Sequence, residues 1–273
     1  MLIAQVTDTH IKTDGALAYR KVDTAANLAR CVDHLGRLDP APDIVLMTGD
    51  LADFGRPEEY RLLRRLIAPL GCPVYVIPGN HDDRENLRRA FSDHDYLPGD
   101  GEFLHYAVED YPVRLVGLDT TIPGAPGGTM CARRLQWLDR TLAEAPDRPT
   151  AIFMHHPPFL TGITHMDVQN CDAGDALGAL IESHPQVMRV MCGHVHRPIQ
   201  LQWHGVTASI APSPSHNVAL DLREDGPPCF FIEPAACQLH QWREDTGLIS
   251  HLSFIGEFAG PYPFFDEHGN LID

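Results

Sequence analysis

The sequence lacks any apolar run of the roughly 20 residues that a membrane-spanning helix needs. Its first residues also lack a basic start, and their apolar run is interrupted at Gln5, Thr7 and Asp8, which does not resemble a secretory signal. We therefore expect a cytoplasmic protein with no membrane partner.

Basic charge is scarce, because 21 Lys and Arg stand against 37 Asp and Glu, which gives a formal net charge of −16. An acidic surface repels the phosphate backbone, so we expect no extended nucleic acid as a partner, and a nuclease is disfavoured. A small phosphate ester is not excluded, because bound cations can invert the charge locally.

The chain has no Cys-x-x-Cys pair, and its cysteines are odd in number. This pattern favours reduced, mostly buried thiols over a disulfide framework or a zinc ribbon. The seven cysteines are Cys31, Cys72, Cys131, Cys171, Cys192, Cys229 and Cys237.

The 273 residues suffice for one large domain, or for a domain with a small appendage. In the first part of the chain, apolar runs at 2–6, 44–47 and 73–77 predict strands, and apolar residues at helical spacing predict helices over 24–38 and 57–70. Thr24 is the expected N-cap of the first of these helices. This alternation predicts a parallel half-sheet.

The later sequence predicts further strands and helices, and from about residue 223 proline, glycine and aromatic residues become frequent. Strands are expected at 103–108, 113–118, 150–154, 187–191, 199–203, 206–210 and 218–222, and helices at 85–91, 133–144 and 173–182. Beyond residue 223, short antiparallel strands are expected at 229–232, 237–242 and 248–254. We therefore predict a catalytic domain over 1–222, a small β cap or dimer-contact element over 223–256, and a tail over 257–273 that packs back on the core or on a partner.

Five of the expected strands end in clusters of side chains that commonly bind metals. These clusters are Asp8-Thr9-His10, Gly49-Asp50, Gly79-Asn80-His81-Asp82, His155-His156 and Gly193-His194-Val195-His196. The ends of parallel strands meet at one edge of an α/β sheet, and carboxylate, amide and imidazole groups are metal ligands. The combination predicts a metal site.

Each cluster alone has a simpler interpretation. Asp8 and His10 would face the same side of an extended segment, but they could also be a turn aspartate beside a surface histidine. Asp53 could be only a turn cap, and Asn80 could simply lead a turn. Of the adjacent His155 and His156, on opposite faces of a strand end, only one is expected to bind metal. The recurrence at five strand ends favours the metal site.

The order of these motifs resembles that of the calcineurin-like metallophosphoesterases. The similarity is closer to the branch of class III cyclic-nucleotide phosphodiesterases and bacterial glycerophosphodiesterases, through Gly55-Arg-Pro-Glu-Glu-Tyr60 and Ile152-Phe-Met-His-His-Pro-Pro158. The resemblance covers most of residues 1–216.

The resemblance implies a pair of metal ions drawn from Fe, Mn, Zn and Co, with Asp50 as the bridging ligand. His155 is preferred over His156 because the ligand of the family stands two positions before the proline. The implied ligands are Asp8, His10 and His196 for one ion and Asn80, His155 and His194 for the other.

The resemblance also implies groups that contact the substrate. His81 would stabilise the transition state or help protonate the leaving alkoxide, beside Asn80. His216 would bind the substrate phosphate, unless it is only a loop histidine. Tyr19 would line the pocket through a hydrogen bond near the second metal.

The implied fold is a four-layer α/β/β/α sandwich of two mixed sheets, with a small C-terminal β cap that also makes a dimer. Residues 54 and 69 are Phe and Pro, so the intersubunit disulfide that some relatives use near these positions cannot form. The exposed aromatic residues expected in the tail favour a homodimer or higher homo-oligomer. They are Phe258, Tyr262, Phe264 and Phe265.

These observations predict a phosphodiesterase with a dinuclear metal site. It would hydrolyse small phosphodiesters, glycerophosphodiesters or 3′,5′-cyclic nucleotides or both, by in-line attack of a metal-bridging hydroxide. Alternatives within the same superfamily are a phosphomonoesterase, a protein phosphatase or a phosphonate monoester hydrolase. An alternative of another class is a catalytically silent scaffold, which would be expected to have lost ligands.

Overall fold

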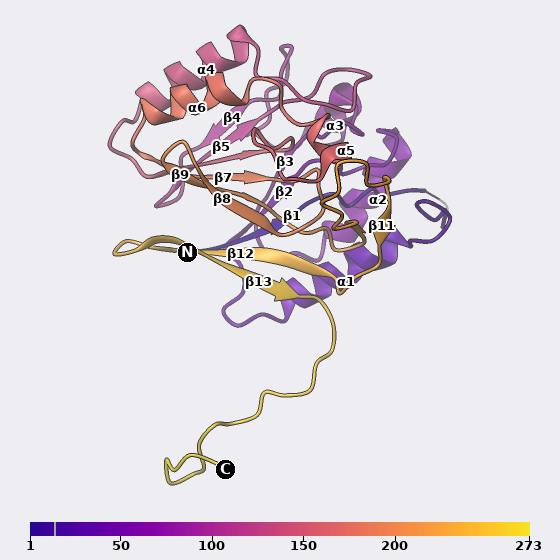
Figure 1. Ribbon diagram of the computed structural model, residues 1–273, viewed down its shortest axis with the longest axis vertical. Helices are drawn as coiled ribbons and strands as arrows, with labels where there is room; N and C mark the ends of the chain where they lie inside the picture. Colours follow the sequence, from indigo (N-terminus) through magenta and orange to yellow (C-terminus); the bar gives the residue numbers. More distant parts are fainter. Residues whose placement is uncertain (14) are drawn as a thin grey trace.

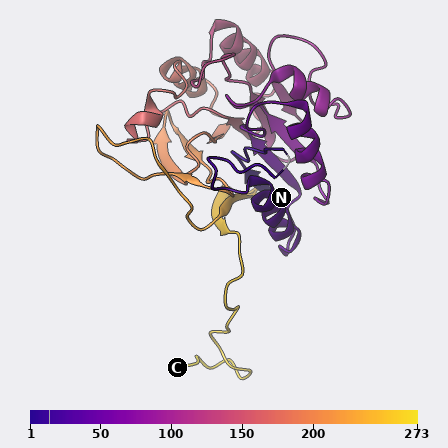
Figure 2. The same ribbon diagram turned by 90° about the vertical axis from the view of Figure 1, so that its right-hand side faces the viewer.

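The protein folds into two mixed β-sheets that lie between two layers of helices (Figure 1). The computed structural model describes residues 1–13 and 15–273. Figure 2 shows the indigo and purple helices of the first part of the chain on one side of the sheets and the later helices on the other. The four-layer arrangement expected from the sequence is confirmed.

The first sheet has the strand order β13-β12-β1-β2-β3. β1 (Leu2–Val6), β2 (Ile44–Thr48) and β3 (Val74–Ile77) are parallel, with Val6 opposite Met47 and Thr48 opposite Ile77. This register ends the three strands at one edge, so the loops that follow them lie together. All three strands are buried, which explains their unbroken apolar runs.

Three helices pack on this sheet: α1 (Thr24–Gly36), α2 (Pro57–Ile67) and α3 (Arg84–Ala90). The N-cap of α1 is Asp23, whose Oδ1 accepts a hydrogen bond from the Ala26 amide at 3.0 Å. The expectation that Thr24 caps this helix is wrong, because the Thr24 hydroxyl instead donates to the His10 carbonyl at 2.9 Å.

The second sheet has the strand order β4-β5-β6-β7-β9-β8. Its strands are β4 (Tyr106–Val108), β5 (Arg114–Leu118), β6 (Thr150–Met154), β7 (Val187–Cys192), β8 (Ile199–Trp203) and β9 (Val206–Ile210). The helices α4 (Ala132–Ala143) and α6 (Gly174–Glu182) pack on it, and the short α5 (Thr164–Asp167) follows β6. The central strands β5, β6, β7 and β9 are parallel, so β6 and β7 also end at a common edge.

The C-terminal strands differ from the separate cap expected over residues 223–256. β12 (Ala236–Arg243) pairs antiparallel with β1, and β13 (Gly247–Phe254) pairs with β12. Both strands therefore extend the first sheet. This pairing joins segments more than 230 residues apart, which local sequence pattern does not reveal.

A small hairpin stands outside the two sheets. It consists of β10 (Asn217–Val218) and β11 (Phe230–Phe231). The strand expected over residues 218–222 is wrong beyond Val218. Leu220 and Leu222 alternate as in a strand but are exposed, and Asp221 binds Arg223 instead.

The tail from residue 257 onward is exposed and runs away from the body of the molecule (Figure 1). It does not pack back on the core, and its contact with a partner stays a prediction. None of the helices in the described part of the chain has the length and hydrophobicity that a bilayer-spanning segment needs.

Candidate metal centre

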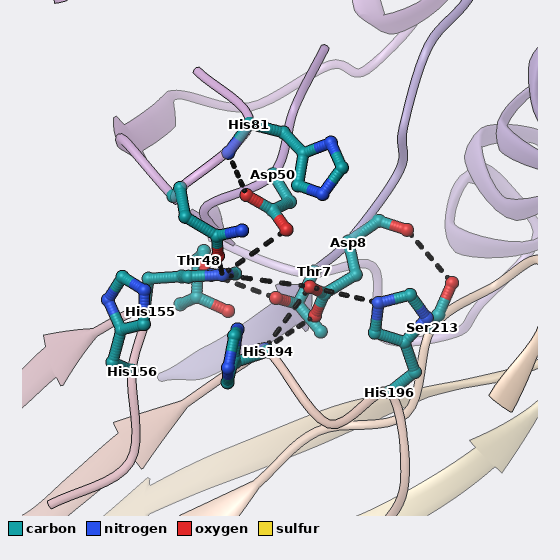
Figure 3. A network of polar contacts seen from close by, with 12 residues as sticks. Thr7, Asp8, Thr48, Asp50, His81, His155, His156, His194, His196 and Ser213 are labelled. Atoms are coloured by element: carbon teal, nitrogen blue, oxygen red, sulfur yellow. Dashed lines mark hydrogen bonds and ion pairs between the residues drawn. The ribbon is translucent and has the colours of Figure 1, made fainter. Parts of the chain in front are cut away.

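All seven side chains expected to bind metal lie together where the two sheets meet. Figure 3 shows Asp8, Asp50, His155, His194 and His196 among them. The first sheet contributes Asp8, Asp50 and Asn80 from the loops after β1, β2 and β3. The remaining ligand candidates, His155, His194 and His196, follow β6 and β7 of the second sheet, and His10 follows β1. Each sheet thus supplies part of the site.

The backbone at these positions is unusual. Eight non-glycine residues of the described chain have positive φ, and five of them are expected ligands. These five are Asp8 (54°), His10 (42°), Asp50 (48°), His194 (73°) and His196 (56°). The expectation that Asp8 and His10 lie on an extended segment is therefore wrong, because the strand ends at Val6. Left-handed backbone is costly for such residues and concentrates at functional sites.

A first group of donor atoms is formed by Asp8, His10 and His196. The two histidine Nε2 atoms are 3.2 Å apart, and His196 Nε2 is 3.3 Å from Asp8 Oδ1. His196 Nδ1 donates to the His216 carbonyl at 3.0 Å, and His10 Nδ1 lies 3.3 Å from Asp53 Oδ1. With both Nδ1 atoms carrying the proton, two Nε2 lone pairs face each other. That contact is repulsive unless a cation lies between them.

A second group is formed by His155, Asn80 and His194. His155 Nδ1 donates to the Thr48 carbonyl at 2.9 Å, and its Nε2 lies 3.1 Å from Asn80 Oδ1. His194 Nε2 is buried and has no hydrogen-bond partner among the residues that the structure describes, which is unfavourable for a polar atom unless it binds a ligand.

The neighbouring His156 differs from His155. Its Nδ1 lies 2.7 Å from the Thr120 hydroxyl, and its Nε2 lies 3.2 Å from the Pro126 carbonyl. Both ring nitrogens are therefore occupied by the protein. His155 is the better ligand of the pair.

Asp50 lies between the two groups. Its Oδ2 is 3.6 Å from His10 Nε2 and 3.4 Å from His155 Nε2. Its Oδ1 accepts a hydrogen bond from the His81 amide at 2.9 Å. This position suits a carboxylate that contacts two cations at once.

The charges of the site also suit cations. Burial disfavours the charged forms of Asp8 and Asp50, yet His196 holds the pKa of Asp8 below its usual range and His155 does the same for Asp50. Burial lowers the pKa of His194 to about 3, so its imidazole is neutral at pH 7. Anionic carboxylates and neutral imidazoles are the forms that bind metal. Burial disfavours the charged form of His155, but Asp50 raises its pKa to about 9, so a bound cation would displace a proton from this imidazole. With that exchange the residues present fit a pair of cations.

Two aspartates that the sequence did not assign to the site support it. The Asp82 carboxylate accepts hydrogen bonds from the amides of Leu51 (3.1 Å), Ala52 (3.1 Å) and Gly79 (2.9 Å). It thereby ties the loop after Asp50 to the loop that carries Asn80.

Asp53 acts on two histidines. Its carboxylate lies 3.3 Å from His10 Nδ1 and 2.5 Å from Lys12 Nζ, and its carbonyl lies 2.8 Å from His81 Nδ1. Asp53 is therefore more than a turn cap. The Gly-Asp-x-x-Asp spacing was the only signal for it in the sequence.

A cavity of about 300 Å³ opens above the ligands. His81, His216 and Tyr19 line it, together with Met166 of α5 and Phe230 of β11. His216 is buried, and burial lowers its pKa to about 2. Its Nδ1 finds no hydrogen-bond partner in the described part of the chain.

Tyr19 lines the cavity beside His216 and Phe230. Its ring centre is 5.4 Å from that of His216 and 5.0 Å from that of Phe230, on the side of His10 and His196. Among the described residues its hydroxyl makes no hydrogen bond. The expected hydrogen bond near the second metal is therefore not observed.

Comparison with known proteins agrees with this geometry. Residues 1–198 match the family model described as calcineurin-like phosphoesterase. A probable glycerophosphodiester phosphodiesterase, GpdQ, from Arcobacter nitrofigilis is 47% identical over 274 residues, covering 100% of both chains. The 3′,5′-cyclic adenosine monophosphate phosphodiesterase CpdA of Pseudomonas aeruginosa is 32% identical over 78% of this chain and 76% of that protein.

A solved structure shares the fold. The dimetal phosphatase from Danio rerio superposes with a TM-score of 0.65 over 93% of this chain and 99% of that chain, at 16% sequence identity. With a family model that spans most of the sequence and a relative aligned over its whole length, the chain belongs to the calcineurin-like phosphoesterase family.

Proposed function

We propose that the chain is a metal-dependent phosphodiesterase that acts on small diesters, with glycerophosphodiesters as the first class to test. The relative that aligns over the full length bears the name of a probable glycerophosphodiester phosphodiesterase. Cyclic nucleotides are the second class, supported by the cyclic-nucleotide phosphodiesterase that covers about three quarters of the chain.

One observation carries the proposal. Two groups of nitrogen and oxygen donors share Asp50. Among the described residues, His10 Nε2 and His196 Nε2 face each other at 3.2 Å, and His194 Nε2 has no hydrogen-bond partner. Asp8, His10 and His196 would hold one cation, and Asn80, His155 and His194 the other, with Asp50 contacting both. When bound, such cations lower the pKa of a water molecule and neutralise charge on a phosphoryl group. Fe, Mn, Zn and Co all suit this donor set.

His81 is placed to act on the substrate. Its Nδ1 is held by the Asp53 carbonyl at 2.8 Å, which leaves Nε2 directed into the cavity. Burial disfavours its charged form, but the negative charge of Asp50 raises the pKa of His81 above its ordinary value. A protonated imidazole at this position can donate to a phosphate oxygen or protonate the leaving alkoxide.

The cavity favours a small substrate. α5 and the β10–β11 hairpin enclose the cavity through Met166, Val218 and Phe230, and the His216 side chain also lines it. A volume of about 300 Å³ is at the lower end of ligand pockets, which favours a small substrate.

Activity on matched substrates tests the proposal. Protein reconstituted with Mn²⁺, Co²⁺, Zn²⁺ or Fe²⁺ should hydrolyse bis(p-nitrophenyl) phosphate faster than p-nitrophenyl phosphate. Glycerophosphocholine and 3′,5′-cyclic AMP then separate the two diester classes. A strong preference for the monoester would instead identify a phosphomonoesterase, and failure to bind any cation would support the silent scaffold.

The Asn80→Ala variant probes the ligand set. Loss of the amide oxygen should weaken one cation site and lower diesterase activity by orders of magnitude, measured as turnover and as cation content. Turnover near that of the unmodified protein would remove Asn80 from the ligands.

We also propose a cytoplasmic location and association as a homodimer or higher homo-oligomer. The seven cysteines are all free, and Cys31, Cys171, Cys192 and Cys237 are buried, which fits a reducing compartment. The aromatic side chains of the exposed tail support association between copies.

A further inference from the structure

A chain of buried hydrogen bonds runs from the C-terminal strands to the metal centre. Gln5 of β1 is its middle member. The Gln5 Nε2 donates to Thr48 Oγ1 and to the Cys192 carbonyl, both at 3.0 Å. Its Oε1 lies 3.1 Å from His240 Nε2, and His240 Nδ1 lies 2.7 Å from the Ser250 hydroxyl.

The chemistry of these groups fixes the direction of every bond. A backbone carbonyl can only accept, so the amide nitrogen of Gln5 must face Cys192 and its oxygen must face His240. His240 Nε2 therefore carries the proton, and His240 Nδ1 accepts from Ser250. Burial, with the positive charge of Arg189 nearby, lowers the pKa of His240 to about 3, which agrees with this neutral form.

The bonds end beside the ligands. Thr48 is the last residue of β2, two positions before Asp50, and its carbonyl accepts the Nδ1 proton of His155 at 2.9 Å. Cys192 is the last residue of β7, two positions before His194. One side-chain amide thus joins the ends of strands that belong to different sheets.

We propose that Gln5 and His240 are positioning residues of the metal centre. The Gln5 amide sets the spacing of the two sheets where their ligands meet, and His240 holds that amide in the required orientation. The strands β12 and β13 then belong to the support of the metal centre. This inference rests on the metal centre proposed above, and it is independent of the substrate.

The network leaves little room for substitution. Without the Gln5 amide, three buried partners (Thr48 Oγ1, the Cys192 carbonyl and His240 Nε2) lose a hydrogen bond, and water has no access to replace it, since all four residues are buried. Groups that orient metal ligands through such contacts typically change metal affinity by about 10–100-fold when they are lost.

The test uses variants of the full chain that keep side-chain volume. Gln5→Met removes the amide. Gln238→Met is the matched control, because Gln238 is also a buried glutamine that reaches from the first sheet to the second, where it donates to the Ile210 carbonyl at 3.4 Å. Ile210 ends β9, whose end carries no ligand. His240→Met removes the donor to Gln5, whereas His240→Gln keeps a donor.

Co²⁺ titration and the visible absorption spectrum of the Co²⁺-loaded protein report on ligand geometry, and thermal unfolding of the metal-free protein reports on stability. Gln5→Met should weaken Co²⁺ binding about tenfold or more and alter the spectrum. His240→Met should shift both readouts in the same direction, and His240→Gln should restore them to within about threefold of the unmodified protein. Gln238→Met should lower the melting temperature without changing the spectrum.

An unchanged Co²⁺ affinity and spectrum in Gln5→Met and His240→Met would overturn the inference, and so would an equal spectral change in Gln238→Met. If Gln5→Met fails to fold, the two His240 variants decide alone. Absence of Co²⁺ binding in the unmodified protein would overturn both the proposed function and this inference. Normal Co²⁺ binding without diesterase activity would count against the function only.

Discussion

At the scale of single residues, the adjacent His155 and His156 show how neighbours decide the role of an imidazole. Both are buried and their ring centres are 4.8 Å apart. His155 gives one nitrogen to the Thr48 carbonyl and keeps Nε2 for the site, whereas both nitrogens of His156 contact Thr120 and Pro126. The same side chain thus serves as a candidate ligand in one position and as a structural group in the next.

Alanine substitution should separate the two roles. His155→Ala should lose one cation per chain and lower diesterase activity at least about a hundredfold, because a direct ligand is gone. His156→Ala should keep both cations but lower the free energy of unfolding by about 2–4 kcal/mol, because a buried side chain and its hydrogen bonds are lost. Metal analysis and denaturant unfolding measure both effects, and loss of a cation in His156→Ala would make His156 the ligand.

One glycine, Gly79, allows two loops of the site to approach each other closely. A Cβ at Gly79 would overlap Oδ1 and the backbone nitrogen of Asp50, whereas a Cβ at Gly71 would meet no atom within 4 Å. Gly79→Ala should therefore displace Asp50 and weaken cation binding about tenfold or more. Gly71→Ala, the matched control, should bind cations normally, and equal titrations for the two variants would contradict this explanation.

The candidate ligands could be selected from the sequence because each follows a recognisable strand and the order of the motifs is distinctive; their binding of metal stays a prediction. Asp82 and Asp53 could not be assigned in the same way. Their roles depend on backbone amides of another loop and on the ring orientation of His10 and His81, and neither follows from spacing along the chain.

At the scale of elements, β12 is the unexpected component. It lies against β1 along its length, with His240 opposite Ile3, and it places a neutral histidine inside the first sheet. The sequence predicted most strands and helices to within a few residues because their apolar periodicity is local. It did not predict which strand β12 would join, because that choice depends on the edge that β1 leaves open.

The buried His240 should make the metal-free protein sensitive to acid. Its pKa is about 3 in the folded chain and about 6.5 when unfolded, so the unfolded state binds more protons as the pH falls below 6.5. The contribution of His240 to stability is complete above pH 6.5 and is lost by about 1.4 kcal/mol per pH unit between 6.5 and 3.

His240→Gln isolates this effect, because every other histidine is common to both proteins. Between pH 7.5 and pH 5, the unmodified protein should lose about 2 kcal/mol more than the variant, measured by urea unfolding without metal. Equal losses in the two proteins would show that His240 titrates normally.

At the scale of the whole molecule, the C-terminal tail exposes aromatic side chains that a single copy of the chain does not bury. Phe258, Tyr262, Phe264 and Phe265 are each more than half exposed. Such a segment is unfavourable in water unless it contacts something, which is why we expect association between copies.

Removal of residues 257–273 should therefore lower the oligomeric mass without unfolding the protein. Light scattering after size exclusion measures the mass, and thermal unfolding together with Co²⁺ binding shows whether the core persists. A truncated chain of unchanged mass would place the contact between copies elsewhere.

The split of the proposed ligands between two sheets has a mechanical consequence. Neither half of the chain holds a full coordination sphere, so a bound ion would cross-link the two sheets at their interface. Removal of the ions by a chelator should then destabilise both sheets together. Protease should begin to cleave segments of the first sheet and of the second sheet at the same chelator concentration.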